Sequence, residues 1–175
     1  MKLSGMGGKV LIKPDLYYII FSALMFFFML VFIPRQTIKK LFWFGMLWGS
    51  TFDFLMETAF CFFNILRYEH IQPFNVGYLS IWTVLAWTPT NMMLIYFLPE
   101  SPKQYVFWVY ILMYSGLTAL IGIVLVNLGL LVFVHWNAVC WFVLGVVYYY
   151  LMVKHYRSLT DGAKLGGALE PNRIG

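Results

Sequence analysis

The sequence predicts an all-α integral membrane protein, a helical bundle with about five transmembrane helices. Apolar residues make up 62% of the 175 residues, charged residues only 11%, and the mean hydropathy is +0.78. Soluble domains carry about 25% charged residues, so this chain lies outside their usual range. Because one helical crossing of a bilayer takes roughly 20 residues, about five crossings would use most of the chain.

Five apolar segments, separated by prolines, charges and turn-forming residues, mark the expected spans. They are residues 16–33, 41–66, 78–98, 105–126 and 130–153. The last two share one apolar run that is too long for a single crossing, and Asn127 with Gly129 offers the break. The fifth span is therefore expected to begin at Leu130 or at Ala138.

The two ends of the chain differ from this apolar body in composition. Residues 1–15 are expected to form an N-terminal segment that precedes the transmembrane bundle of residues 16–153. Residues 154–175 are polar and rich in glycine, a composition typical of a flexible tail.

The distribution of Lys and Arg predicts a multi-pass plasma-membrane protein with its N-terminus outside and its C-terminus cytoplasmic. If the first loop is cytoplasmic, that side holds Arg35, Lys39, Lys40, Lys103, Lys154, Arg157, Lys164 and Arg173. The opposite side holds Lys2, Lys9, Lys13 and Arg67, of which the three lysines favour the reverse orientation. These basic residues flank apolar runs and form no patch on a polar surface, so no nucleic-acid partner is predicted.

Many Tyr and Trp residues lie near the expected span ends, where amphipathic rings prefer the headgroup region. This group includes Tyr18, Tyr68, Tyr148 and Tyr149, which are interpreted as interfacial anchors. The alternative is that clustered aromatic rings line a quinone, carotenoid or haem pocket. The sequence assigns no cofactor, and it contains no Cys/His cluster typical of a metal site.

Two acids interrupt the second expected span, in the stretch "GSTFDFLMETAFCFFNIL" at residues 49–66. Asp53 and Glu57 are four residues apart and so lie on one side of a helix, near the middle of the span. An Asp at the centre of a membrane helix costs about 2.5–3.5 kcal/mol on insertion scales, and no Lys or Arg lies inside an expected span. We expect at least one of the acids to be protonated or bound to a cation.

Neutral polar residues are expected to surround this buried acidic site. The candidates are Ser50, Asn64, Thr83, Thr90, Asn91, Ser115, Thr118 and His135. Such side chains more often form interhelical hydrogen bonds than ligand contacts, and His135 beside Trp136 is typical of an interfacial loop. The acids are stronger candidates, because ionisable residues inside a membrane are costly and commonly functional.

Three segments of the chain resemble a family of small multi-span membrane proteins of unknown function from spore-forming bacteria of the Bacillus and Clostridium type. These are "FIPR", "TPTNMMLIYFLPES" and "VNLGLLVFVHWN" followed by a Tyr-rich helix, and the resemblance covers residues 16–155. It implies a bacterial plasma-membrane protein of about five spans and transfers no functional residue. Members of that family are expected to place an acid in the fourth span, where this chain has only Ser115 and Thr118.

Three functions remain open at the level of sequence. The favoured one is a non-enzymatic membrane protein in which Asp53 and Glu57 serve proton- or cation-linked transport or sensing. The second is an enzyme acting on an isoprenoid or lipid with a carboxyl as general acid. The third is a structural or accessory subunit in which the acid pair only fixes helix packing. No GxSxG, HExxH, P-loop or GxGxxG motif names a reaction, and no protein partner is indicated.

Overall fold

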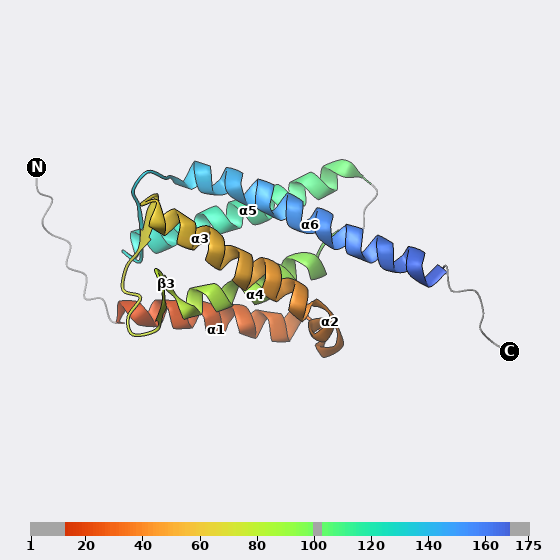
Figure 1. Cartoon of the computed structure of the whole chain (residues 1–175), viewed down its shortest axis with the longest axis horizontal. Coiled ribbons are helices and arrows are strands. Elements are labelled where there is room, and N and C mark those ends of the chain that lie inside the picture. Colours follow the sequence, from red (N-terminus) through yellow and green to blue (C-terminus); the bar gives the residue numbers. More distant parts are fainter. Residues whose placement is uncertain (1–12, 100–102, 169–175) are drawn as a thin grey trace, which may run out of the picture.

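The computed structural model describes residues 13–99 and 103–168, which are mostly helical (Figure 1), so the predicted all-α class is confirmed. The helices are α1 (Pro14–Phe32), α2 (Arg35–Gly45), the π-helix η1 (Met46–Thr51), α3 (Phe52–Phe62), α4 (Ile81–Tyr96), α5 (Gln104–Asn127) and α6 (Ala138–Ala168). Because α2, η1 and α3 follow one another without a break, the described residues form five helical runs.

Four short strands lie at the end of the bundle where α1 begins (Figure 1). β1 (Leu66–Tyr68) pairs antiparallel with β4 (Leu131–Phe133), and β2 (Asn75–Val76) pairs antiparallel with β3 (Leu79–Ser80). The β1–β4 pair joins the loop after α3 to the loop after α5. It therefore fixes the strand end of α3 against the α5–α6 hairpin.

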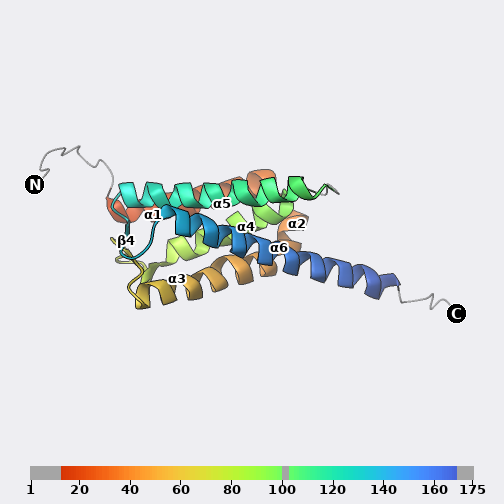
Figure 2. The same cartoon turned by 90° about the horizontal axis from the view of Figure 1, so that it is seen from above.

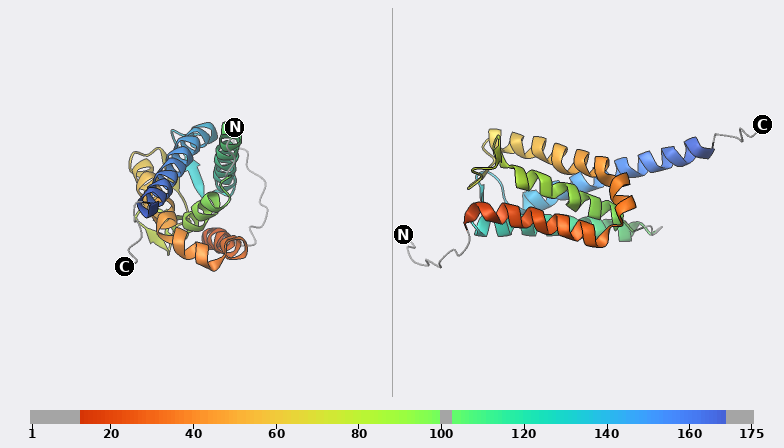
Figure 3. Two further views of the ribbon diagram at one scale, coloured as in Figure 1. Left: turned by 90° about the vertical axis from the view of Figure 1, so that its right-hand side faces the viewer. Right: turned by 90° about the horizontal axis from the view of Figure 1, so that it is seen from below.

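Helix α4 is the central element of one half of the bundle and lies between α1 and α3 (Figures 1 and 3). Ten of its sixteen residues are buried, although Pro89 stands inside it. Proline lacks the backbone N–H and so removes one hydrogen bond from the helix. Side-chain hydroxyl groups donate hydrogen bonds to backbone carbonyls close to Pro89. Ser50 donates to the Val84 carbonyl at 2.9 Å, and Thr90 donates to the Ala86 carbonyl at 2.8 Å.

The other half of the bundle is the hairpin of α5 and α6, which run side by side (Figure 2). The last helix begins at Ala138, which is the second of the two expected starts, and not at residue 130. Gly129, with φ of 71°, ends α5 in the left-handed conformation that glycine adopts readily. The Asn137 side chain then accepts a hydrogen bond from the Cys140 backbone N–H at 2.9 Å, which is an N-cap.

The expected flexible tail from residue 154 is also contradicted, because α6 continues to Ala168 and projects beyond the bundle (Figure 1). Side chains in this extension contact other helices. The Trp48 indole N–H donates to His155 Nδ1 at 2.9 Å, and the Arg157 guanidinium lies 4.8 Å from the ring centre of Phe107. Residues 1–12 and 169–175 of the expected terminal segments lie outside the described residues.

The second expected span also differs at both ends. Its helical run begins at Arg35 rather than residue 41 and ends at Phe62 rather than residue 66. Asn64 has φ of 54°, and the Ile65 backbone N–H reaches back to the Phe60 carbonyl at 2.8 Å. This is the hydrogen-bond pattern of a helix C-terminus with a left-handed residue, a position that Asn tolerates well.

The outer surface of the bundle is unusually apolar. Large apolar side chains that are more than half exposed occur on every helical run except the largely buried α4, among them Phe27, Leu30, Trp43, Leu55, Phe62, Val109, Leu120 and Val139. Within the described residues, two helices are long and apolar enough to cross a membrane, Gln104–Asn127 and Ala138–Thr160. Core helices of soluble proteins pass the same test of length and composition, but those are mostly buried, whereas only 28% of each apolar window is buried here.

Candidate functional site

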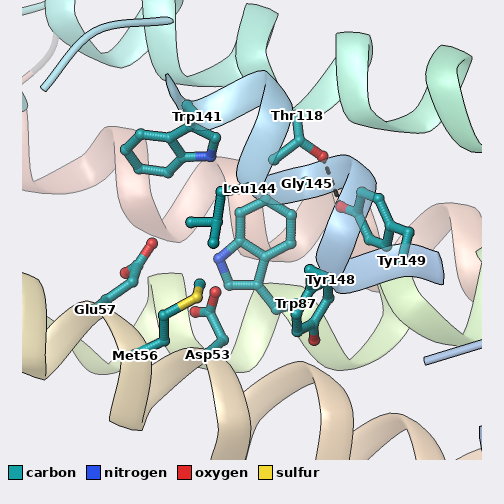
Figure 4. A pocket seen from close by; sticks show the side chains of 10 residues that line it. All are labelled: Asp53, Met56, Glu57, Trp87, Thr118, Trp141, Leu144, Gly145, Tyr148 and Tyr149. Atoms are coloured by element: carbon teal, nitrogen blue, oxygen red, sulfur yellow. Dashed lines mark hydrogen bonds between the residues drawn. The ribbon is translucent and has the colours of Figure 1, made fainter. Parts of the chain in front are cut away.

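A small cavity lies between α3, α4, α5 and α6, and both acids line it (Figure 4). Its volume is about 30 Å³, which is enough for one or two water molecules. The lining residues are Asp53, Met56, Glu57, Trp87, Thr118, Trp141, Leu144, Gly145, Tyr148 and Tyr149. Figure 4 shows the two carboxyl groups directed from α3 into this space, which we call the acid cavity.

The two acids are buried with few partners. Asp53 is 7% exposed and Glu57 is 1% exposed. Glu57 Oε1 accepts a hydrogen bond from the Tyr68 hydroxyl at 2.7 Å, whereas Glu57 Oε2 and Asp53 Oδ2 are buried without a partner. Within residues 13–99 and 103–168, neither carboxyl forms an ion pair with Lys, Arg or His. Buried charges are normally paired, so the acids require a proton, a cation or water from outside the chain.

Tyr68 reaches Glu57 because the short β1–β4 pair holds it in place. In this register Tyr68 lies opposite Leu131 at the end of the bundle. Burial raises the pKa of the Tyr68 hydroxyl well above its ordinary value, and the nearby Glu57 carboxylate raises it further. The hydroxyl therefore remains protonated and serves as a permanent donor to Glu57.

Aromatic rings form much of the remaining wall. Trp87 projects from α4 between the acids and α6, and its indole N–H is buried without a partner (Figure 4). The Tyr149 hydroxyl shares a hydrogen bond with the Thr118 hydroxyl at 2.6 Å. The Tyr148 hydroxyl accepts a hydrogen bond from Asn91 Nδ2 at 2.9 Å and donates to the backbone carbonyl of Trp48. The cavity thus combines unpaired carboxyl oxygens with rings from two further helices.

The π-helix η1 lies immediately before Asp53 and brings α3 close to α4. The Phe52 backbone N–H bonds the carbonyl of Leu47, five residues earlier, as a π-turn requires. A Cβ atom added at Gly49 would lie 2.6 Å from the Trp87 carbonyl oxygen and 2.7 Å from the Thr88 Cα atom. Only glycine permits this approach, which places the carboxyl of Asp53 beside Trp87. π-turns of this kind are frequent at functional sites.

The structure distributes the predicted supporting residues unevenly. Of these, Thr118 lines the acid cavity, and Asn91 contacts it through Tyr148. Ser50 bonds the Val84 carbonyl and the Thr88 hydroxyl, whereas Thr90 and Ser115 each bond a carbonyl of their own helix. Thr83 is buried and its hydroxyl has no partner.

Two of the predicted supporting residues lie outside the acid cavity. Asn64 is exposed and forms the left-handed end of α3, so it does not continue the face of Asp53 and Glu57. His135 is exposed in the segment between β4 and α6. Neither lines the acid cavity, and neither forms a hydrogen bond with the acids.

Sequence reasoning missed the tyrosines of the site, because it interpreted Tyr68 and Tyr149 as interfacial anchors. Both are buried, with exposed fractions of 8% and 2%. Tyr18, interpreted in the same way, is 1% exposed and donates to the backbone carbonyls of Glu69 and Leu130, each at 2.7 Å. The weak signal available was the number of tyrosines, which exceeds what anchoring five spans requires.

Replacing Tyr68 by Phe should destabilise the protein by about 1–3 kcal/mol, because Glu57 would lose its one described donor and keep a buried unsatisfied oxygen. The measurement is thermal unfolding of the purified protein in detergent, followed by tryptophan fluorescence. Tyr78→Phe is the matched control, since Tyr78 is 51% exposed. Equal stability of the two variants would show that the Tyr68 hydroxyl contributes nothing to the site.

Comparisons of the chain with protein-family models, curated protein sequences and solved structures give no match, so the site stands on its geometry alone.

Proposed function

We propose that the protein is a multi-span membrane protein in which Asp53 and Glu57 bind and pass a proton or a small cation, in transport or in sensing. The observation that carries this proposal is a cavity faced by two buried carboxyls that have unpartnered oxygens and, within the described part of the chain, no basic partner. A soluble structural site would be expected to pair such groups. Buried carboxyls without a cationic partner are typical of proton and ion pathways in membranes.

The exposed apolar surface supports the membrane part of the proposal. Soluble monomers rarely expose apolar patches larger than a few hundred Å², whereas here large apolar side chains are exposed on every helical run. Five runs crossing a bilayer would place this surface against lipid. In this arrangement the strand end and the α2 end of the bundle would lie at opposite membrane surfaces.

The described basic residues support the orientation with the C-terminus in the cytoplasm. Helix α2, the start of α5 and the C-terminal part of α6 lie at one end of the bundle (Figure 1). These segments, with the N-cap of α5, carry Arg35, Lys39, Lys40, Lys103, Lys154 and Arg157. The strand end holds Lys13 and Arg67. By the positive-inside rule, the α2 end faces the cytoplasm, and the resemblance to the spore-former family makes a bacterial plasma membrane its expected location.

A flux assay tests the proposed function. Wild type, Asp53→Asn/Glu57→Gln and the control Glu69→Gln are reconstituted in liposomes that contain a pH-sensitive dye, with a parallel set containing a Na⁺-sensitive dye. Wild type and Glu69→Gln should dissipate an imposed gradient equally, because Glu69 is exposed at the strand end. The double variant should match protein-free liposomes, since amides cannot exchange a proton.

Identical traces for wild type and the double variant in both dye sets would contradict the proposal. That result would leave the acid pair as a packing device. Circular dichroism of each variant in detergent distinguishes a loss of flux from a loss of fold.

A further inference from the structure

An apolar groove on the side of the bundle lies next to the acid cavity. This α3/α6 groove has a volume of about 420 Å³, within the roughly 300–1,000 Å³ that is typical of small-molecule sites. Its lining residues are Trp48, Phe52, Leu55, Met56, Leu144, Val147, Tyr148 and Leu151. Met56, Leu144 and Tyr148 also line the acid cavity, so the two spaces share a wall.

The outer part of the groove is accessible from the side of the bundle. Leu55 is 61% exposed, Val147 is 51% exposed and Leu151 is 47% exposed. Under the proposed function this side faces the hydrocarbon of the bilayer. A ligand whose body is an apolar chain could therefore enter laterally and lie between α3 and α6 without exposing the chain to water.

The inner end of the groove selects the head of such a ligand. Asp53 Oδ2 and Glu57 Oε2 are buried acceptors without partners, and the rings of Trp87, Trp141 and Tyr148 border the same space. Carboxylates and aromatic faces together favour a cation, above all an ammonium group. The cavity of about 30 Å³ has room for a group of roughly water size, which fits a primary ammonium and is too small for a quaternary one.

We propose that the acid cavity and the α3/α6 groove form one binding site for an amphiphilic primary alkylamine, with the ammonium at Asp53 and Glu57 and the chain in the groove. The inference rests on the proposed function, for which it names the class of cation. When R–NH₃⁺ binds to a protonated carboxyl, the ion pair forms and the carboxyl proton leaves to water, so charge is conserved and one proton is exchanged for one ammonium.

Titration calorimetry in lipid nanodiscs tests this site, with empty nanodiscs as the blank for partition into lipid. The probes are dodecylamine and dodecanol, which have the same chain and differ in the head. Wild type and Glu69→Gln should bind dodecylamine saturably at one per chain, and dodecanol should give only the partition signal. Asp53→Asn/Glu57→Gln should weaken dodecylamine binding by at least about tenfold, equivalent to about 1.4 kcal/mol.

A variant in the α3/α6 groove tests the binding of the alkyl chain separately from the binding of the ammonium by the acids. Val147→Trp adds bulk to the groove at a half-exposed position that does not line the acid cavity. It should also weaken dodecylamine binding by at least about tenfold while retaining the wild-type proton traces in liposomes. Leu120→Trp, on α5 and 59% exposed, is the control for added bulk and should bind like wild type.

The outcomes distinguish this inference from the proposed function. Proton flux that depends on the acids, combined with a dodecylamine titration equal to that of empty nanodiscs, would overturn the amine site and leave the proposed function intact. Equal dodecylamine affinity in wild type and in the double acid variant would also overturn it. Acid-dependent amine binding without acid-dependent flux would support the site and remove the transport role.

Discussion

Replacing Gly49 by Ala should destabilise the bundle by about 1–3 kcal/mol, the usual range for overpacking a tight core. The added Cβ would meet the backbone of α4 at 2.6 Å from the Trp87 carbonyl oxygen and 2.7 Å from the Thr88 amide nitrogen. Backbone atoms cannot turn aside as a flexible side chain can, so η1 and α4 must separate. Because Trp87 borders the acids, the same separation should open the acid cavity.

Gly116→Ala is the matched control for the Gly49 variant. Gly116 also lies inside a helix, but a Cβ atom there would meet nothing within 4 Å. Alanine is favoured over glycine in a helix interior by about 0.8–1 kcal/mol, so this variant should be as stable as wild type or more so. Thermal unfolding in detergent compares the two, and a Gly49→Ala protein as stable as Gly116→Ala would contradict the close approach of η1 and α4.

The helical class of the chain could be predicted because it depends on composition and segment length, which are local properties. The short β1–β4 pair could not, because its strands of three residues are far apart in sequence and lie at the ends of apolar stretches. Their pairing is a tertiary contact, and it shortens the expected spans at residues 66 and 130. In hindsight Asn137 carried a local signal for the start of α6, since Asn is a favoured N-cap.

The acids of the site were predicted because an unpaired carboxyl in an apolar helix is conspicuous in any sequence. Their neighbours were harder to find. Tyr68 and Tyr149 stand near the ends of apolar segments, where both an anchor and a buried donor are consistent with the local pattern. The π-turn also rotates the residues before Asp53 relative to its side of the helix. A helical wheel drawn with a constant α-helical period does not include this rotation. Whether a tyrosine is buried and where a π-turn forms both depend on how the helices pack.

The second large effect that we expect is the protonation of the acid pair, Asp53 and Glu57, at neutral pH. Asp53 and Glu57 both line the acid cavity, and no basic residue among those that the structure describes pairs with them. Two ionised carboxylates there would repel each other in a medium that screens charge poorly. We expect the pair to hold at least one proton at neutral pH.

Infrared spectroscopy of the protein in an ester-free detergent at neutral pH measures this proton directly, through the C=O stretching band of a protonated carboxyl, which lies apart from the amide and carboxylate bands. The wild type should show the band, the Glu69→Gln control should retain it, and Asp53→Asn/Glu57→Gln should lack it. A wild-type spectrum without a protonated carboxyl, in the absence of added cations, would contradict the account of Asp53 and Glu57 as a proton-binding pair.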